Sequence, residues 1–403
     1  MSEWTKVKLK DCCHSISDGD HLPPPKSDSG VPFVTIANID ATNHIDFGNT
    51  MFVPYEYYNN LNDIRKAKFN DILYSVVGSF GKPVLIKENK PFAFQRHIAI
   101  LRPNNGIVDS RFLYYVMLSR DFYMQADTVA IGAAQRTISL TALRNMEVEL
   151  PSMEIQHRIA NILSRYDSLI ENYQKQIKLL EEAAQRLYKE WFVDLRFPGH
   201  ENTKIVDGLP EGWEKMKLCE FTGITDGTHD SPKQVEIGLP LVTGRCIVDG
   251  SIDFSQAYNI SEEDVININK RSAVEDGDIL LSNIGTIGKV CRISKSGNYA
   301  VKNMIIFKPH DAIHSCFLHR FLTDNNTQMD FLQQAAGTSQ KFVSLSFIRN
   351  TLILRPSDTI LNLFYNHSEK YFNYVHSLQT QLRLLTEARD RLLSKLMSGE
   401  ITV

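Results

Sequence analysis

The stretch DILYSVVGSFGK, residues 71–82, returns as DILLSNIGTIGK at residues 278–289. Working outward, the segment that starts at Asp18-Gly19 returns from Asp226-Gly227, and the segment from Gly132 to Pro151 returns at residues 337–356. The order of the matching residues is the same in both copies. The chain is therefore a tandem duplication of one large unit and not a solenoid of short repeats.

Length and composition indicate an ordered globular protein. The 403 residues are 43% hydrophobic and 23% charged, which suits two domains with their own cores. The formal net charge of −3 excludes a generally basic protein, so any contact with DNA must come from local patches. The sequence shows no membrane-spanning run and no signal peptide at Met1-Ser2-Glu3-Trp4, which predicts a cytoplasmic protein without a membrane partner.

The six cysteines do not form a metal-binding pattern. They show no C-x-x-C spacing and do not recur between the copies, which speaks against both a zinc site and a disulfide framework. Cys12-Cys13-His14 resembles a ligand set only superficially, because adjacent cysteines suit one tetrahedral ion poorly. We expect ordinary buried or partly buried thiols and no metal.

Each copy begins with a β-rich module of mixed α/β character. Short runs rich in β-branched residues are bounded by Gly, Pro, Asn and Asp, as strands are. A helical spacing of apolar residues follows an Asp109-Ser110 cap and extends to residue 124. The predicted strands are 31–37, 72–77, 83–86 and 97–101 in the first copy and 239–243, 279–283, 290–293 and 304–307 in the second.

Each copy ends in a long helix with an apolar period near 3.5. The first helix follows Pro151, with Ser152 as a cap and Glu154 in the first turn, and the second follows Pro356. A stripe sustained this long requires a partner helix, which we expect to be the helix of the other copy. The residues predicted to pair the helices and to dock partners are Ile159, Ile162, Tyr166, Leu169, Tyr173, Ile177, Leu180, Leu187, Tyr371, Val375, Leu378, Leu382, Leu385 and Leu392.

Two such helices predict a rigid spacer with one module at each end. A helix of about 40 residues is about 60 Å long. The predicted fold is thus mixed α/β, with two β-rich modules separated by two long antiparallel coiled-coil helices and related by a pseudo-twofold axis. The predicted domains are 1–151 (first module), 152–200 (first helix and junction), 201–356 (second module) and 357–403 (second helix and tail).

A spacer of this size suits a split DNA site, because major-groove faces on one side of a duplex lie about 34 to 36 Å apart. Arg and Lys bind guanine edges or phosphates, and Asn and Gln bind adenine edges, although each such residue is also common on ordinary surfaces. The DNA-binding candidates are His21, Lys26, Lys82, Gln95, Arg96, Gln135 and Arg136 in the first copy and His229, Lys233, Lys289, Lys302, Asn303, Gln340 and Lys341 in the second.

The glycines that recur near these candidates have a simpler interpretation. We expect Asp18-Gly19 and its counterpart to form tight turns, and Gly78 and Gly81 to form a bend between strands. The phosphate-loop pattern G-x-x-x-x-G-K-[ST] is absent from the sequence.

Several motifs resemble a known family. WFVD at 191–194, FPG at 197–199 and LPEGW at 209–213 look like the junction between the halves of specificity (S) subunits of Type I restriction-modification systems. The ending RLLSKLMSGEI at 391–401 is similar to the C-terminus of that family, and GTHDSP at 227–232 resembles a stretch of its target recognition domains. The resemblance covers the full length.

The resemblance implies a DNA-recognition role without catalysis. Each module would be a target recognition domain that reads one half of a bipartite site, and the helices would set the gap and dock two methyltransferase (M) subunits. S-adenosylmethionine would bind the M subunits, and ATP and Mg would serve restriction (R) subunits where these exist, so this chain would hold no cofactor. Residues 20–24, DHLPP, differ from residues 228–232, THDSP, which implies an asymmetric site.

Two other functions were weighed. A fused adenine methyltransferase would need an N-P-P-Y-like loop and a glycine-rich cofactor turn, but Val53-Pro54-Tyr55 lacks the Asn and the second Pro. The recurring Asp71 and Asp278 are predicted to cap turns and not to catalyse. The alternative of a non-DNA two-headed coiled-coil scaffold that binds proteins or peptides stays open through Tyr57 and Tyr58, taken as exposed aromatics.

Overall fold

The computed structural model describes residues 4–21, 23–40, 42–133, 135–337 and 341–403. It divides into two compact units, Met1–Tyr173 with Gln381–Val403 and Gln174–Thr380. Each unit therefore takes in part of both long helices, whereas the sequence-based division gives those helices segments of their own. We call residues 5–150 head 1 and residues 214–355 head 2.

Head 1 is built on a four-stranded antiparallel sheet and a three-stranded sheet with one parallel pair. The first has the order β2 (Cys13–Asp18), β8 (Ile98–Pro103), β5 (Ile72–Ser75), β6 (Pro83–Leu85). The second has the order β4 (Met51–Val53), β3 (Val31–Val34), β7 (Ala93–Phe94), with β3 and β7 parallel. A third pair joins the ends of the head, β1 (Thr5–Lys8) with β9 (Glu147–Leu150).

The helices of head 1 cover the central sheet, whose strand β5 is buried along its whole length. One core lies between the sheet and the helices, and a second lies on the other face. Covering on both faces explains why β5 reads as a continuous apolar run. The helices are α1 (Leu9–Cys12), η1 (Ile36–Asn38), α2 (Tyr55–Asn60), η2 (Asp63–Arg65), α3 (Ser110–Leu118), α4 (Arg120–Val129) and α5 (Leu140–Asn145).

The helix predicted from residue 109 to 124 is in fact two helices. Asp109 caps α3 as predicted, accepting hydrogen bonds from the backbone of Arg111 and Phe112. The prediction of continuity is wrong, because Ser119 adopts an extended conformation and its Oγ accepts from the backbone N–H of Phe122 at the start of α4. A serine at this position competes with the helix for backbone donors, which breaks it.

Head 2 repeats the same topology, which confirms the duplication. Its four-stranded sheet has the order β13 (Gly223–Asp226), β21 (Met304–Lys308), β18 (Ile279–Ser282), β19 (Val290–Arg292). Its three-stranded sheet has the order β17 (Tyr258–Ile260), β14 (Leu239–Val242), β20 (Ala300–Val301), with β14 and β20 parallel. β12 (Glu214–Lys217) pairs with β22 (Leu352–Arg355), as β1 pairs with β9.

The remaining elements of head 2 also follow the plan of head 1, with a short two-stranded hairpin where head 1 has an antiparallel bridge between Ile39 and Ile45. They are α7 (Leu218–Phe221), η5 (Gly244–Cys246), β15 (Ile247–Val248), β16 (Ser251–Ile252), η6 (Phe254–Gln256), α8 (Glu262–Ser272), α9 (Ala312–Thr323), α10 (Asn325–Gln333) and α11 (Leu345–Asn350).

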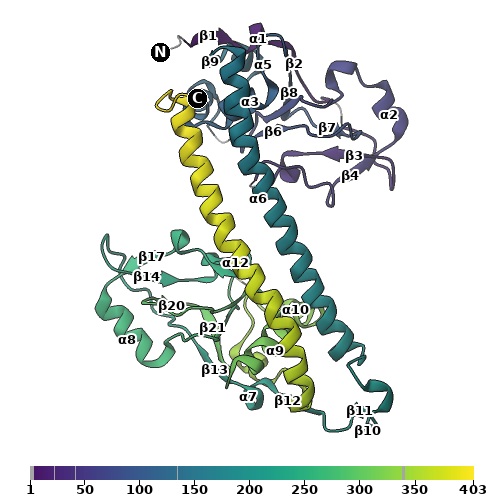
Figure 1. Ribbon diagram of the computed structural model, residues 1–403, viewed down its shortest axis with the longest axis vertical. Coiled ribbons are helices and arrows are strands. Elements are labelled where there is room, and N and C mark those ends of the chain that lie inside the picture. Colours follow the sequence, from purple (N-terminus) through teal and green to yellow (C-terminus); the bar gives the residue numbers. More distant parts are fainter. Residues whose placement is uncertain (1–3, 22, 41, 134, 338–340) are drawn as a thin grey trace. The chain divides into compact units, whose positions relative to one another are not determined.

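The two long helices are α6 (Met153–Tyr188) and α12 (Asp358–Met397). In the first unit, Ile159 of α6 shares a core cluster with Leu393 and Leu396 of α12. In the second unit, Tyr188 at the end of α6 shares a cluster with Phe364 near the start of α12. The start of each helix therefore meets the end of the other, so the helices are antiparallel (Figure 1).

Only some residues of the apolar stripe predicted for the long helices are buried. Leu169 is 37% exposed, whereas its neighbour Ile170 is buried. Adjacent apolar pairs such as Leu169-Ile170 leave the helix phase open in the sequence, and packing decides it. Among the predicted residues, Ile159, Ile177, Val375 and Leu378 are buried, and Ile162, Tyr166, Tyr173, Leu180, Leu187, Tyr371, Leu382, Leu385 and Leu392 are half-buried.

The junction after α6 packs into the core of the second unit. A π-helical turn, η3 (Lys189–Val193), carries Trp191 and Phe192, and the η4 turn (His200–Asn202) and the β10–β11 hairpin (Ile205–Val206, Leu209–Pro210) follow. The ring centroid of Phe192 lies 4.9 Å from those of Phe317 and Phe364. Edge-to-face packing of this kind adds to the burial of the rings. The junction is thus a folded part of the unit and not a loose linker.

Two findings bear on the expected class of protein. Within the described ranges, no helix is both long enough and apolar enough to cross a membrane. Cys12 is buried and Cys13 half-buried, and both are free thiols. This confirms the prediction of ordinary buried or partly buried thiols at these two positions.

Candidate nucleic-acid interface

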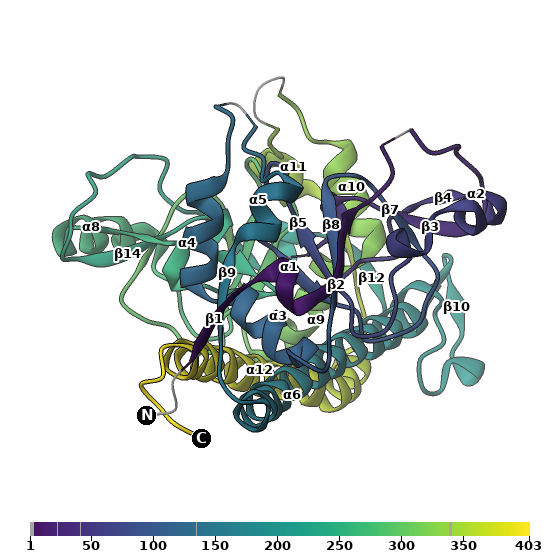
Figure 2. The ribbon, with the colours of Figure 1, turned by 90° about the horizontal axis from the view of Figure 1, so that it is seen from above.

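In head 1, the loops that carry the candidates meet at one end of the four-stranded sheet. Asp18 ends β2 opposite Ala99 of β8, and Ser75 ends β5 opposite Ile98. Figure 2 shows β8 between β2 and β5. Beyond the strands, the N–H of Val76 donates to the carbonyl of His97 at 2.9 Å. The N–H of Gly78 donates to the carbonyl of Arg136, also at 2.9 Å, which adds the loop before α5. Segments far apart in sequence thus form one surface.

Head 2 assembles the same loops in the same way. Asp226 ends β13 opposite Ile305 of β21. The N–H of Gly285 donates to the carbonyl of Lys341 at 2.9 Å, and the N–H of Asn303 donates to the carbonyl of Thr228 at 3.0 Å. The candidates His229, Asn303 and Lys341 therefore lie in loops that share one end of the sheet of head 2.

A cluster of Asp, His and Arg lies at this end of head 1. Nε2 of His21 lies 2.9 Å from Oδ2 of Asp18, and the imidazole is largely exposed. Arg65 of η2 places Nη2 3.8 Å from Asp18 and Nη1 3.5 Å from Asp20. The hydroxyl of Tyr57 also donates to Asp20 at 2.8 Å, and burial raises the pKa of that phenol. Arg65 thus pairs with both carboxylates, and Asp18 orients the imidazole of His21.

Head 2 contains the same cluster at matching positions. Nε2 of His229 lies 2.8 Å from Oδ2 of Asp226, and Nδ1 lies 3.0 Å from Oδ1 of Asn303. Arg271, at the end of α8, places Nη1 3.6 Å from Asp226 and donates to the carbonyls of Asp226 and Gly227. Neither Arg65 nor Arg271 is among the candidates that the sequence indicates. Both precede the repeated Asp71 and Asp278 by a few residues, which is the signal that an alignment of the two copies offers.

Gly19 follows β2 and Gly227 follows β13, and both have a different role from the predicted one. Gly19 and Gly227 were expected in tight turns, but the backbone continues in extended form and bridges in parallel at the next residue. A Cβ on Gly19 would lie 2.1 Å from the carbonyl oxygen of Phe94, and one on Gly227 would lie 2.3 Å from that of Val301. The turn prediction is therefore wrong, and the glycines allow two segments to pass closely.

The predicted bend between β5 and β6 is confirmed. Gly78 and Gly81 have positive φ values of 68° and 91°, and Ser75 Oγ accepts from the N–H of Lys82 at 2.9 Å. Ser282 Oγ accepts from the N–H of Lys289 in head 2, at the same distance. The bend is thus braced identically in both heads.

Besides Lys302, whose Nζ donates to Ser231 Oγ at 2.6 Å, two of the candidate cations are already engaged within the protein. Lys289 Nζ donates to the carbonyl of Ile247 at 2.7 Å. The Arg136 guanidinium pairs with Asp127 and lies 5.3 Å from the ring centroid of Phe80. Contact of either group with DNA would have to compete with these interactions.

The other candidates differ in exposure. Lys26, Arg96, Gln135, Lys233 and Lys341 are exposed, and Lys82, Gln95, Lys302 and Asn303 are half-buried. Gln340 lies outside the described residues.

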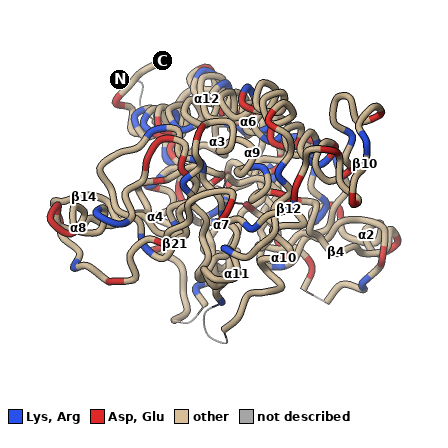
Figure 3. Tube along the Cα trace, turned by 90° about the horizontal axis from the view of Figure 1, so that it is seen from below, with Lys and Arg blue, Asp and Glu red and all other residues tan. Residues whose placement is uncertain are grey.

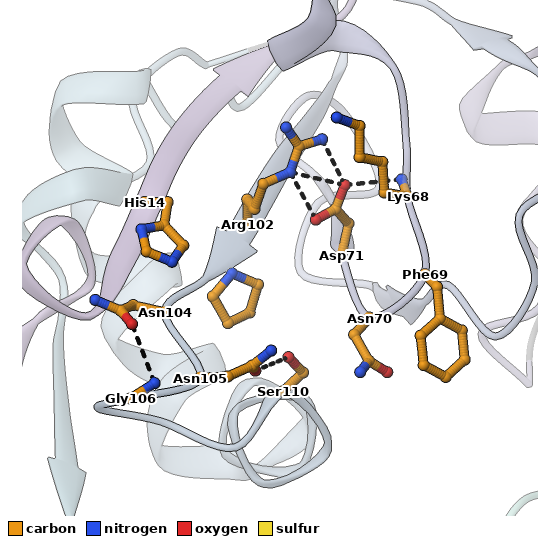
Figure 4. Close-up of a pocket in the computed structure, with 11 residues that line it drawn as sticks. His14, Lys68, Phe69, Asn70, Asp71, Arg102, Asn104, Asn105, Gly106 and Ser110 are labelled. Atoms are coloured by element: carbon orange, nitrogen blue, oxygen red, sulfur yellow. Dashed lines mark hydrogen bonds and ion pairs between the residues drawn. The ribbon is translucent and has the colours of Figure 1, made fainter.

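A polar pocket lies at the opposite end of each sheet. In head 1, a cavity of about 470 Å³ contains Asp71, whose carboxylate accepts from Arg102 and from the N–H of Lys68 (Figure 4). In head 2, Asp278 accepts from the N–H of Glu275 and pairs with Lys308 at 2.6 Å, while burial raises its pKa. Both aspartates cap turns, as predicted from the sequence.

Residues of both charges are spread along the chain. Lys and Arg are interspersed with Asp and Glu over the described residues, as Figure 3 shows. This agrees with the formal net charge of −3 and leaves local clusters as the means of contacting DNA.

The two tyrosines whose expected exposure left a protein-binding scaffold as an alternative are not exposed in the structure. Tyr57 and Tyr58 are half-buried and pack against the cluster of Val31, Phe33 and Val53. The expectation of two exposed tyrosines is therefore wrong.

Comparison with known proteins gives a consistent result. Residues 1–182 match the family model described as "Type I restriction modification DNA specificity domain". The chain is 27% identical to the MjaIX specificity subunit of Methanocaldococcus jannaschii over 75% of this chain and 71% of that one. It is 23% identical to the HindI specificity subunit of Haemophilus influenzae over the full length of both.

A solved structure supports the fold. The S subunit of a type I restriction-modification system from M. genitalium superposes with a TM-score of 0.61 and 17% identity, covering 98% of this chain and 96% of that one. Residues 1–182 thus match the DNA specificity domain of type I restriction-modification systems, and the chain as a whole is similar to the specificity subunits of such systems.

Proposed function

We propose that this specificity subunit recognises a bipartite, asymmetric DNA sequence, with one half-site read by each head. The observation that carries the proposal is that both heads gather the same set of polar loops at the same end of the same sheet. Arg, Lys, Asn and Gln side chains at such a surface suit base edges and phosphates. The match of residues 1–182 to the DNA specificity domain, and the similarity of the chain to specificity subunits, favour DNA recognition over the alternative of a scaffold for proteins or peptides.

The long helices are proposed to dock two M subunits. Each helix leaves large apolar side chains exposed, among them Leu169 and Leu384 in the first unit and Leu179, Leu363 and Tyr374 in the second. Exposed apolar side chains on a packed helix support the presence of a partner that covers them. Their presence in both units suits one M subunit for each.

The chain itself is proposed to act without catalysis or cofactor. Methyl transfer would require S-adenosylmethionine in the M subunits, and any R subunits would use ATP and Mg. The complex would work in the cytoplasm, where its DNA substrate lies.

The test is to express the chain with its M subunit and to map N6-methyladenine across the genome. A bipartite motif that disappears when this chain is deleted is the expected result. Methylation that is unchanged by the deletion would reject the proposal and favour the alternative of a scaffold for proteins or peptides.

A further inference from the structure

We propose that one two-residue segment in each head, Gln95-Arg96 in head 1 and Lys302-Asn303 in head 2, determines which bases that head reads. The proposal rests on the proposed function and deepens it, because it separates residues that select bases from those that only support the reading surface.

The two segments occupy equivalent positions. Gln95 follows β7 and forms a parallel bridge with Asp20, and Lys302 follows β20 and forms a parallel bridge with Thr228. Each segment precedes the central strand of its four-stranded sheet, β8 or β21. The close approach at Gly19 and Gly227 fixes each segment beside the histidine loop.

Three residues beside the segments are the same in both heads, but the segments differ. Asp18, His21 and Arg65 in head 1 correspond to Asp226, His229 and Arg271 in head 2, with nearly identical distances. A group that is identical in both heads cannot distinguish two different half-sites. The selecting residues must therefore be sought among those that differ.

The chemistry of the segments suits base recognition. Head 1 offers a Gln amide and an Arg guanidinium, which favour adenine and guanine respectively, and head 2 offers a Lys ammonium and an Asn amide. Arg96 is exposed at the end of the sheet. Because a good bidentate pair contributes strongly to discrimination, exchanging these groups changes the preferred base.

Contacts in head 2 show how the common cluster supports the variable segment. Asn303 Oδ1 lies 3.0 Å from Nδ1 of His229, whose other nitrogen is held by Asp226. Lys302 Nζ donates to Ser231 Oγ at 2.6 Å. Asp226 and Arg271 thus act as positioning residues, and the amide of Asn303 is held in a defined orientation.

A second pair of residues that differs between the heads is less suited to this role. Arg136 corresponds to Lys341, but its guanidinium is engaged with Asp127 and with the ring of Phe80. Reading a base with Arg136 would first require these contacts to break.

The experiment exchanges the segments within the complete complex with M subunits. The head 1 variant carries Gln95→Lys with Arg96→Asn, and the head 2 variant carries Lys302→Gln with Asn303→Arg. Each purified complex is allowed to select from a DNA pool with randomised half-sites. We expect a preference shift of roughly 10- to 100-fold at one or two positions of a single half-site, with the other half-site unchanged.

The controls separate selection from support. Lys68→Asn, at the opposite end of the sheet of head 1, should leave both half-sites unchanged. His21→Ala should weaken binding to all sequences without changing the preferred bases. If an exchange abolishes binding, Arg96→Lys and Asn303→Gln decide the question, since both keep hydrogen-bonding groups and should alter preference in one half-site.

An unchanged motif in the exchanged complexes, or in the conservative variants where binding is lost, would overturn the inference. A wild-type complex without any bipartite preference would instead reject the proposed function, so the two failures are distinguishable.

Discussion

Arg389 of α12 pairs with Asp167 of α6, with Nη1 and Oδ1 separated by 3.0 Å in the first unit. The hydroxyl of Tyr115 donates to the other oxygen of Asp167 at 2.6 Å, and burial raises the pKa of that phenol. One carboxylate thus joins both long helices to α3 of head 1. The second unit has Arg320 at the place of Tyr115, since Phe112-Leu113 recurs as Phe317-Leu318. The two ends of the helix pair are therefore chemically different.

Arg389→Ala should destabilise the first unit, because it leaves a mostly buried carboxylate without its cation. We expect the free energy of unfolding to fall by about 1–3 kcal/mol. Arg391→Ala is the matched control, since Arg391 is exposed and pairs only with Glu387 in the same turn, and it should cost less than about 1 kcal/mol. Urea denaturation measures both variants, and equal losses would show that the Asp167 contact is not stabilising.

The ion pair between His44 of head 1 and Glu171 of α6 should make stability depend on pH. Nε2 of His44 lies 3.1 Å from Oε1 of Glu171, and this hydrogen bond raises the pKa of His44. The same hydrogen bond, together with the ion pair to Lys87, lowers the pKa of Glu171 to about 2. The contribution of Glu171 is present above its ordinary pKa of 4.5 and is lost as pH falls towards 2. The contribution of His44 to stability is complete below pH 6.5 and is lost as the pH rises through the raised pKa of His44.

The corresponding measurement compares melting temperatures of the wild type and Glu171→Gln across pH. The wild type should exceed the variant most between about pH 4.5 and 6.5, and less on either side. A difference that stays constant with pH would contradict this account.

Gly227→Ala should disrupt the reading surface of head 2, because the new methyl group would meet the carbonyl of Val301. We expect a loss of about 1–3 kcal/mol in stability and weaker recognition of one half-site only. Gly297→Ala is the control, since the nearest atom to its Cβ would be at 3.5 Å. Thermal melting and DNA selection test both variants; a normal half-site in Gly227→Ala would mean that the close approach is not needed.

Phe192→Ala should unfold the junction, because this ring packs between Phe317 and Phe364 in the core. The expected loss is about 3–5 kcal/mol in the free energy of unfolding. The neighbouring Val193 is exposed, so Val193→Ala should be nearly neutral. Chemical denaturation distinguishes the two, and similar effects would contradict the packing described for the junction.

The sequence predicted the duplication and the two long helices because both depend on patterns that survive divergence. Buried strands such as 72–75 and 279–282 keep their apolar residues, and the bend after them keeps its glycines. The sequence could not predict which of Leu169 and Ile170 is buried in α6, because either residue fits the apolar period. Only packing against the rest of the unit selects Ile170.

The candidate site was predictable only where both copies carry similar residues in similar loops. His21 and His229 were found in this way. Arg65 and Arg271 were missed because the segments before Asp71 and Asp278 resemble each other little and the two arginines are offset by one residue relative to these aspartates; the fold brings them to Asp18 and Asp226. The role of Gly19 depends on the carbonyl of Phe94, which lies far away in the sequence.

The most direct test of the central claim is a chimaera in which residues 214–355 replace residues 5–150. The cut points are equivalent, because Thr5 pairs with Leu150 as Glu214 pairs with Arg355. The measurement is the N6-methyladenine map in cells that express the chimaera with the M subunit. If each head reads one half-site, the motif should contain the half-site of head 2 twice. A motif that still contains the half-site of head 1 would contradict the account.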